Sequence, residues 1–235
     1  GVERHVADLA LAQAAAGDTV RVVGGDPASM TEALGRAVDH RAASRTADVV
    51  RALMTWAPSS DVVHVHMTAA EVAATTAAVL RPALRQVPVV ATRHFAGPRG
   101  SGALGPLVGA VPRRRVMEQV AISRYVAGHV EGRTTIVHPG VTAPPSVPPA
   151  ADRAPVVLMA QRLEPEKSAD VGLRAFAASG LVEHGWRLEG AGAGALSTPL
   201  QERAVTLGIA PATRFLGPRD DVPQLMARAA LLLAP

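Results

Sequence analysis

Two cations in the second half of the chain have the residue types and spacing needed to hold phosphate. Arg162 and Lys167 lie five positions apart, directly after the apolar run at 156–159 and before a helical pattern. In α/β proteins the loop beyond the carboxyl end of a parallel strand faces the ligand crevice. A guanidinium fork and a mobile ammonium group could together neutralise a diphosphate there. The alternative is that both are surface cations paired with Glu164 and Glu166.

Three histidines lie at or near the ends of predicted strands. His64 and His66 alternate on one strand and therefore share a face, and His94 ends the next predicted strand before a loop rich in glycine and proline. Three imidazoles suggest zinc, but no cysteine or acidic residue stands at a metal-ligand spacing beside them, so we expect no metal. We expect His64 to be an interior histidine with its hydrogen bonds satisfied, and we favour His94 for chemistry.

A glycine-rich stretch, EGAGAGA at 189–195, follows a predicted strand and precedes a predicted helix. It matches the relaxed dinucleotide pattern G-x-G-x-x-A. A NAD site would also need an acidic residue at the end of the next strand, where the sequence has TRFLG at 213–217. The stretch therefore indicates that a phosphate or sugar approaches the backbone, without indicating NAD. Hydrolase and P-loop patterns are absent from the sequence.

These residues must be positioned by strands that alternate with helices. In the first half we expect a helix over 69–80 and strands at 20–23, 61–66, 87–92, 120–123 and 135–137. In the second half we expect strands at 156–159, 186–189, 213–216 and 231–235, and helices at about 168–179, 198–207 and 221–228. Near-continuous apolar strands separated by helices predict parallel sheets covered on both faces, in an α/β fold.

A proline-rich segment divides the chain. Four prolines lie within residues 142–151, where they can neither pair in a sheet nor continue a helix. We expect a first domain over 1–141, a linker over 142–152 and a second domain over 153–235, with a ligand cleft between the domains. No strand precedes the first helical pattern and the chain stops at a newly formed strand, so we expect a fragment in which the first strand is missing and the second domain is incomplete.

Composition excludes several functional classes. The hydrophobic share of 48% supports a packed core, and an aromatic share of 3% requires that core to be made of Ala, Val and Leu. A net charge of +4, with arginines clustered only at 113–115, does not indicate a nucleic-acid partner. Cysteine is absent, and we find neither a signal peptide nor a membrane-spanning run. We expect a cytoplasmic protein, with the arginine-rich, lysine-poor usage typical of high-GC bacteria.

The order of these segments resembles that of the retaining nucleotide-sugar glycosyltransferases of family 4. GVERHV at 1–6 resembles the end of the family's glycine loop, GG-x-E-x-x-V; HPGV at 138–141 resembles P-N-G-V; and RLEPEK at 162–167 resembles R-L-x-x-E-K-G. The intervening segments follow in the family's order: DVVHVH, TRH, AIS, GAG, FLG and LLLAP. The resemblance implies the GT-B fold, with two Rossmann-like parallel-sheet domains facing a cleft.

The resemblance also implies an activity. A hexosyltransferase-type enzyme would move a sugar from a nucleotide diphosphate donor to a hydroxyl of a sugar, lipid or small molecule, with retention of configuration. Arg162 and Lys167 would hold the donor diphosphate and stabilise the departing phosphate, so both are expected to be catalytic. The amide of Gly1, at a helix N-terminus, would contact the same phosphates.

The remaining site residues are also implied by the resemblance. His94 would lie beside the donor sugar and the reacting centre as a third catalytic residue, and His66 would line the acceptor side. Gly190 and Gly192 would let the backbone approach the donor, and the loop after Gly217 would border the base. No metal or other cofactor is implied, because the leaving phosphate itself would accept the acceptor's proton. A location at the inner face of the membrane is compatible with this reading.

Departures from the family pattern leave two rival interpretations. His138 stands where the family has Asn, and Ser168 stands where it often has Gly. The E-x7-E acids would follow Pro235, so we expect the 235-residue chain to be an incompetent fragment of an active enzyme. The alternatives are a nucleotide-sugar epimerase of the same fold and a GT-B-fold binding protein without turnover.

Overall fold

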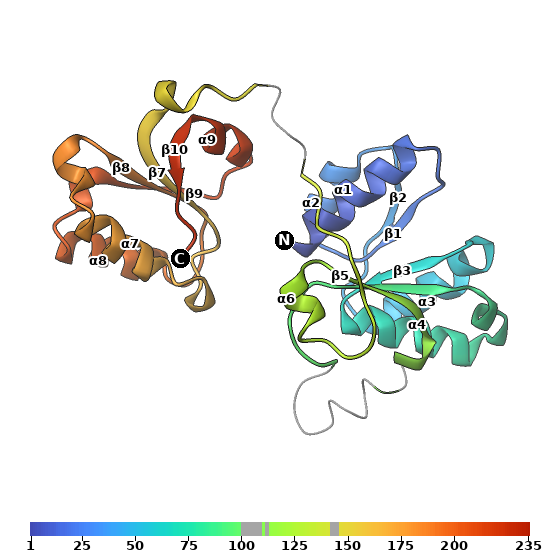
Figure 1. Ribbon diagram of the computed structural model, residues 1–235. Coiled ribbons are helices and arrows are strands. Elements are labelled where there is room, and N and C mark those ends of the chain that lie inside the picture. Colours follow the sequence, from blue (N-terminus) through green and yellow to red (C-terminus); the bar gives the residue numbers. More distant parts are fainter. Residues whose placement is uncertain (100–109, 111–112, 142–145) are drawn as a thin grey trace. The chain divides into compact units, whose positions relative to one another are not determined.

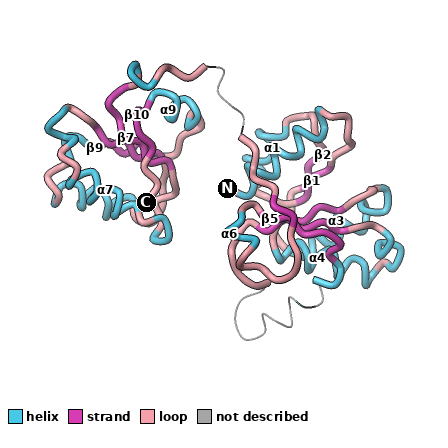
Figure 2. Tube along the Cα trace, in the orientation of Figure 1, coloured by secondary structure: helices cyan, strands magenta, loops and turns pink. Residues whose placement is uncertain are grey.

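The computed structural model describes residues 1–99, 110, 113–141 and 146–235. The chain divides into two compact units, Gly1–Val141 and Thr142–Pro235, which we call unit 1 and unit 2 and describe separately. Figure 1 traces both units along the chain, and Figure 2 shows that helices flank the strands in each of them. Of the expected linker at 142–152, residues 142–145 lie outside the described residues, and Ala150–Asp152 forms a single 3-10 turn.

Unit 1 is an alternation of helices with parallel strands, as the sequence predicts. Its helices are α1 (Val2–Ala15), α2 (Pro27–Leu34), α3 (Thr46–Trp56), α4 (Thr68–Leu80) and α6 (Arg124–Ala127). Its strands are β1 (Arg21–Val23), β2 (Asp39–Arg41), β3 (Val63–His66), β4 (Val89–Arg93), β5 (Val116–Ala121) and β6 (Thr135–Ile136). The strands form two parallel sheets, β1-β2 and β3-β4-β5-β6.

The two sheets of unit 1 border a common cavity. Among the described residues β1 and β3 do not pair with each other, and both line a cavity of about 1020 Å³ to which α1 and α3 also contribute. Trp56 at the end of α3 reaches this cavity, and the guanidinium groups of Arg21 and Arg41 lie over its ring at 5.8 and 4.7 Å. The side chains of Arg21 and Arg41 thus connect the β1-β2 pair to α3, and in the described residues no strand ladder connects it to the larger sheet.

Small residues build the core of unit 1. Ala73 and Ala77 of α4 are almost completely buried beside Val50 of α3, and Val65, Val89 and Ala91 are buried together on β3 and β4. Alanine has a high helix propensity, and with no side chain beyond Cβ it leaves room for close packing. This core agrees with the Ala, Val and Leu composition expected from the sequence.

Unit 2 is a more regular α/β layer. One parallel sheet has the order β10-β7-β8-β9, formed by β7 (Ala154–Ala160), β8 (Arg187–Ala191), β9 (Thr213–Gly217) and β10 (Ala229–Leu232). The helices are α7 (Ala169–Ala178), α8 (Ser197–Thr206) and α9 (Val222–Arg228). Its main core uses larger side chains, among them Phe176, Leu173 and Met159.

Most predicted strands are present within a few residues of their expected bounds. β2 was not expected, and β5 begins four residues before the predicted strand at 120–123. Two consecutive polar residues, Glu118 and Gln119, interrupt the apolar run and hide the start of β5, although Gln119 is buried. In the described part of the chain we find no helix with the length and hydropathy needed to cross a membrane.

Candidate functional site

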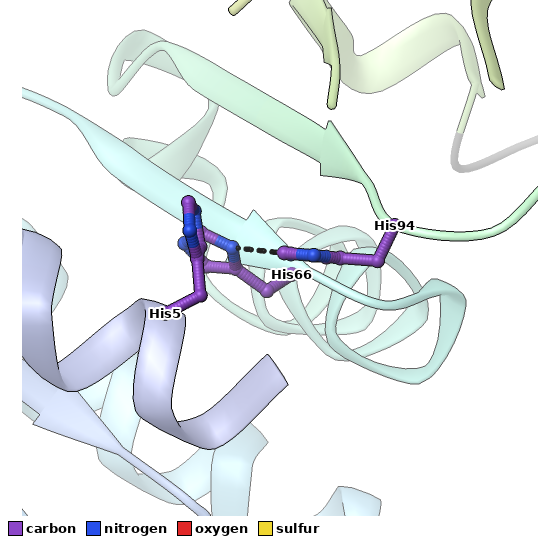
Figure 3. A group of neighbouring side chains, drawn as sticks. All are labelled: His5, His66 and His94. Atoms are coloured by element: carbon purple, nitrogen blue, oxygen red, sulfur yellow. Dashed lines mark hydrogen bonds between the residues drawn. The ribbon is translucent and has the colours of Figure 1, made fainter. Parts of the chain in front are cut away.

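A cluster of histidines lies at the carboxyl ends of β3 and β4. The parallel register pairs His66 with Thr92, so His66 and His94, two residues further on, emerge side by side. His66 Nδ1 and His94 Nε2 are 3.0 Å apart and share one hydrogen bond. His5, one turn into α1, places its ring edge-on to both, with ring centroids 5.7 Å from His66 and 5.0 Å from His94 (Figure 3).

Two histidines of this cluster, His66 and His94, have pKa values far below neutral pH. Burial, reinforced by the neighbouring histidines, lowers the pKa of His66 to about 3. Burial, together with His5 and His64, lowers the pKa of His94 to about 4. Both imidazoles are therefore uncharged near pH 7 and present one donor and one acceptor nitrogen each. Such groups suit uncharged hydroxyls, and they cannot supply positive charge to a phosphate.

His64 has the interior position that its sequence context predicts. Its Nε2 atom lies 2.8 Å from Oγ1 of Thr92, and its ring packs 4.3 Å from that of His66. Burial lowers the pKa of His64 as well, with His5 as a smaller cause. Because its Nε2 atom is already hydrogen-bonded to Thr92, we assign His64 a structural part, in which its ring packs against that of His66.

The loop that carries His94 is anchored at both ends by arginines. Arg93 donates to the carbonyl of Gly97 at 2.9 Å. Arg99 donates from Nε to Glu71 at 2.5 Å, and its backbone N–H donates to Glu131 at 2.8 Å. The side chains of Arg99 and Glu71 are 2% and 1% exposed, so this ion pair is fully desolvated. The short loop from 94 to 98 is thus held between two fixed points.

Met67, the residue directly after His66, has a strained backbone conformation. Met67 has φ 101° and ψ 144°, a region that is essentially reserved for glycine. Such a conformation costs on the order of 1–3 kcal/mol and persists where the surrounding structure imposes it. Strain of this kind clusters at functional sites, and here it turns the chain sharply from β3 into α4.

The second group of predicted residues lies on unit 2. A 3-10 turn at Pro165–Lys167 follows the carboxyl end of β7; Arg162 precedes the turn, Lys167 is its last residue, and both side chains are exposed. Arg162 Nη2 donates to Glu166 at 2.7 Å, so the ion pair considered as an alternative is present. The backbone N–H of Glu166 and then the Arg162 guanidinium hold the pKa of that carboxyl below its usual range. Ser168 follows with φ 50° and ψ 34°, in the left-handed region.

The two glycines predicted to approach a donor have close neighbours within the protein. A Cβ on Gly190, near the carboxyl end of β8, would lie 3.2 Å from the Phe215 ring. Gly192 has φ 140°, and a Cβ there would lie 2.0 Å from the carbonyl oxygen of Gln161. Gly192 therefore lets the loop after β8 lie directly against the loop that carries Arg162.

Further hydrogen bonds join these two loops. Leu163 N–H donates to the carbonyl of Ala193, and Leu196 N–H donates to the carbonyl of Leu163, at 3.0 and 2.9 Å. The Ala195 N–H donates to the Glu164 carboxylate at 3.3 Å. The side chain of Gln161 also donates to the carbonyl of Lys167 at 3.0 Å. The cations therefore stand on a braced double loop.

The structure groups the predicted residues within each unit. His66 and His94 are in contact in unit 1, and Gly1 lies one helical turn before His5, since the Gly1 carbonyl accepts the His5 N–H at 3.1 Å. In unit 2, Arg162 and Lys167 share one loop and Gly192 lies in the adjoining loop.

Two sets of residues were missed by sequence reasoning. His5 joins the histidine cluster, and its only sequence signal is a position in the first turn of a helix that follows a glycine. Arg99, Glu71 and Glu131 form the anchor of the His94 loop. Arg99 lies within a stretch whose glycines and prolines indicate a loop, so nothing local predicts that its side chain is buried.

Comparison with known proteins relates this arrangement to sugar-transferring enzymes. Residues 1–143, more than half of the chain, match Glycosyltransferase Family 4. The chain is similar in structure to HepE of Anabaena in complex with UDP and glucose, with 18% identity, a TM-score of 0.71, and coverage of 97% of this chain and 69% of HepE. A search of curated proteins finds no match.

Two further solved structures are similar. A glycosyltransferase from Rickettsia africae has 16% identity and a TM-score of 0.73, with coverage of 100% of this chain and 69% of that one. The lipopolysaccharide outer core galactosyltransferase WaaB has 16% identity and a TM-score of 0.65, with coverage of 96% and 66%. At these identities the likeness concerns the fold, and it confirms the predicted α/β fold of the GT-B type.

Proposed function

Since the chain belongs to Glycosyltransferase Family 4, we propose that it moves a hexose from a nucleotide diphosphate donor to an acceptor hydroxyl with retention of configuration. The observation that carries this proposal is the braced loop of unit 2, which presents Arg162 and Lys167 to solvent at the carboxyl end of β7. HepE, with a similar fold, was crystallised with UDP, so UDP-linked sugars are the first donors to test.

The Arg162–Glu166 ion pair does not oppose diphosphate binding. The two side chains are 67% and 57% exposed, and exposed pairs of this kind contribute only about 0–1 kcal/mol. A hydrogen bond between a guanidinium and a phosphate involves two ionised groups and contributes about 1.5–3 kcal/mol. A diphosphate would therefore replace Glu166 as the partner of Arg162, and Lys167 would add a second charge.

The glycines act in this proposal by positioning the cations. Gly192 allows contact between the two loops of unit 2, and any larger residue would push the Arg162 loop away. Gly190 keeps the end of β8 flat against Phe215. Their close packing keeps the N–H groups of the loop after β8 near Arg162, where a phosphate or sugar could approach them. The loop after Gly217 would border the base.

The neutral histidines of unit 1 suit the uncharged parts of the substrates. His94 would hydrogen-bond a hydroxyl of the donor sugar beside the reacting centre, and His66 would face the acceptor. Their shared hydrogen bond fixes the tautomers as a pair, because only one of the facing nitrogens can carry the proton. The anchored loop at 94–98 would hold His94 in place during the reaction.

The chemical step then needs charge stabilisation more than a protein base. The bond between the anomeric carbon and the diphosphate oxygen breaks, and the acceptor oxygen forms its bond on the same face. The acceptor proton passes to the departing phosphate oxygen. Arg162 and Lys167 would stabilise the negative charge that develops there, and the Gly1 N–H would add a further contact. We propose that this step uses no metal ion.

Product analysis tests the proposed reaction. The protein expressed from its complete gene is incubated with UDP-, GDP- and ADP-linked hexoses and a panel of hydroxyl acceptors, and the glycoside is identified by mass spectrometry and by its anomeric proton coupling. We expect a glycoside with the configuration of the donor. An inverted product would contradict retention, and nucleotide binding without any glycoside would favour a binding protein.

Substitutions test the residues. We expect Arg162→Ala and Lys167→Ala each to lower kcat by about 10²–10³, the usual loss when a group that stabilises developing charge is removed. Arg174→Ala is the matched control, because Arg174 forms an exposed i,i+4 pair with Asp170 on the same unit. An Arg174→Ala loss as large as that of Arg162→Ala would remove Arg162 from the mechanism.

A further inference from the structure

The histidine cluster of unit 1 has the composition and spacing of a metal-ligand set. One ring nitrogen each of His5, His66 and His94 can be chosen so that all three atoms lie within 4.8 Å of one another. The three rings converge from α1, β3 and the loop after β4 (Figure 3). Each side chain is partly exposed, so an ion and its remaining water ligands could reach the nitrogens from solvent.

The spacing already approaches that of a bound ion. Zinc–nitrogen bonds of about 2.0–2.1 Å place two ligand nitrogens of a tetrahedral site about 3.3–3.4 Å apart. His66 Nδ1 and His94 Nε2 are 3.0 Å apart, so they need to separate by only a few tenths of an ångström. In the described part of the chain the ring of His5 makes no hydrogen bond, so a change of its side-chain torsions could bring its nitrogen to the ion.

We propose that His5, His66 and His94 bind one divalent transition-metal ion, with Zn²⁺ as the preferred physiological ion and a water molecule in the fourth position. Imidazole ligands suit zinc, copper and nickel, whereas magnesium and calcium require oxygen ligands that this cluster lacks. His64 is not included, because its Nε2 is held by Thr92. The positive end of the α1 dipole opposes the ion, so we expect weaker binding than at a closed structural zinc site.

The metal site would inhibit the enzyme. Binding of the ion replaces the hydrogen bond between His66 and His94 and fills the space beside the two imidazoles that would otherwise contact the substrates, so occupancy and sugar transfer exclude each other. This consequence rests on the proposed function, but the metal site itself does not. Zinc binding that leaves transfer unchanged would remove His94 and His66 from the proposed reaction while leaving the metal site intact.

Metal titration of tag-free protein tests the proposal without any assay of activity. Zn²⁺ is titrated calorimetrically, and Co²⁺ is titrated as a spectroscopic probe in the visible range. We expect one ion per chain and the intense absorption of tetrahedral cobalt. Loss of groups that merely orient a ligand costs about 10–100-fold in affinity, so we expect His5→Ala to weaken binding at least tenfold.

A matched variant makes the result specific. His184→Ala removes an exposed histidine from unit 2 and should leave zinc affinity unchanged. His5→Gln, which keeps a polar side chain of similar size, should bind as poorly as His5→Ala, and circular dichroism checks that both variants are folded. The proposal is overturned if the wild-type protein binds no zinc up to millimolar concentration, if cobalt gives only the weak octahedral spectrum, or if His5→Ala and His184→Ala bind equally.

Discussion

The histidine cluster of unit 1 and the cation loop of unit 2 occupy equivalent positions in their own sheets, but they differ in charge. Both lie at the carboxyl ends of parallel strands, β3 and β4 in one case and β7 in the other. His66 and His94 are partly buried and uncharged near pH 7, whereas Arg162 and Lys167 are exposed and charged. One surface suits uncharged hydroxyls and the other suits a diphosphate. In a sugar transfer from a nucleotide donor, these are the two kinds of group to be held.

The two regions also share a form of backbone strain. Among the described residues two non-glycine residues have positive φ, and each directly follows a candidate site residue: Met67 follows His66, and Ser168 follows Lys167. The means of support differ. In unit 1 a buried ion pair holds the His94 loop, and in unit 2 backbone hydrogen bonds between neighbouring loops hold the cations. The comparison predicts that the two regions respond differently to substitution, pH and added ligands.

The largest expected effect comes from removing the buried Arg99–Glu71 ion pair, which belongs to unit 1 alone. Arg99→Met leaves the Glu71 carboxylate buried without its partner, which should lower the free energy of unfolding of unit 1 by about 3–5 kcal/mol. The chain has two tryptophans, Trp56 in unit 1 and Trp186 in unit 2. Urea unfolding of variants that keep only one of them, followed by fluorescence, measures each unit separately.

The controls for Arg99→Met use the same two reporters. Arg174→Met, which removes an exposed pair from unit 2, should change stability by less than about 1 kcal/mol. Adding Glu71→Gln to Arg99→Met should recover part of the loss, because a neutral amide is less costly to bury than a carboxylate. A loss below 1 kcal/mol in unit 1 would show that the ion pair does not anchor the His94 loop.

Acidification should destabilise unit 1 more than unit 2, and the same unfolding assay measures the difference. The folded-state pKa values of His66, about 3, and His94, about 4, lie below the ordinary value of 6.5. Below pH 6.5 the unfolded chain therefore binds protons that folded unit 1 does not, and unit 1 loses stability as the pH falls. At pH 5 His66 contributes a loss of up to about 2 kcal/mol, and the more exposed His94 contributes less because solvent screens it. His5 and His64 also pack against these rings, and they are left unchanged in the variants described below.

The measurement is urea unfolding at pH 7.5, 6 and 5 in the presence of a chelator. Unit 2 contains only His184, an exposed histidine, and should change little over this range. The double variant His66→Gln/His94→Gln should remove most of the pH dependence of unit 1. Equal losses in the two units would contradict the lowered pKa values of His66 and His94.

The smallest expected effect concerns the strained residues. Ser168 adopts a left-handed conformation that costs about 1–2 kcal/mol, and its side chain makes no hydrogen bond to the start of α7. Glycine removes this strain, but its greater freedom in the unfolded chain lowers the stability by about 0.5–1 kcal/mol. Ser168→Gly should therefore stabilise unit 2 by up to about 1 kcal/mol. Met67→Gly is the counterpart in unit 1. Destabilisation by both substitutions would mean that the side chains, and not the strain, matter at these positions.

Local patterns predicted most of the strands, and they correctly placed Arg162, Lys167, His66 and His94 at or near strand ends. Runs of valine and leucine identified β3, β7 and β8, and residues at strand ends could be placed at one sheet edge without knowing the packing. Ser168, which departs from the glycine of the family pattern that the sequence resembles, has a positive φ of the kind that glycine adopts most easily.

Long-range contacts account for what the sequence did not predict. His5 is separated from His66 by 60 residues, and only the docking of α1 brings them together. Arg99 stands in a stretch with loop composition, yet its partners come from α4 and β5, with Glu71 and Gln119 distant in sequence. Gly192 was expected to face a ligand, and its close contact with Gln161 depends on the path of a different loop. Periodicity carries no information on such pairings.

The most direct test of the central claim, that the cation loop of unit 2 holds the donor diphosphate, uses a property of the sequence. Lys167 is the single lysine of the chain. Reductive methylation with ¹³C-formaldehyde keeps its charge and gives one lysine signal besides that of the amino terminus, assigned with Lys167→Arg. On titration with UDP, GDP and ADP, we predict a saturable shift of this signal with at least one nucleotide, and weaker binding in Arg162→Ala but not in Arg174→Ala. A nucleotide that binds by calorimetry while the Lys167 signal stays unmoved would contradict the account.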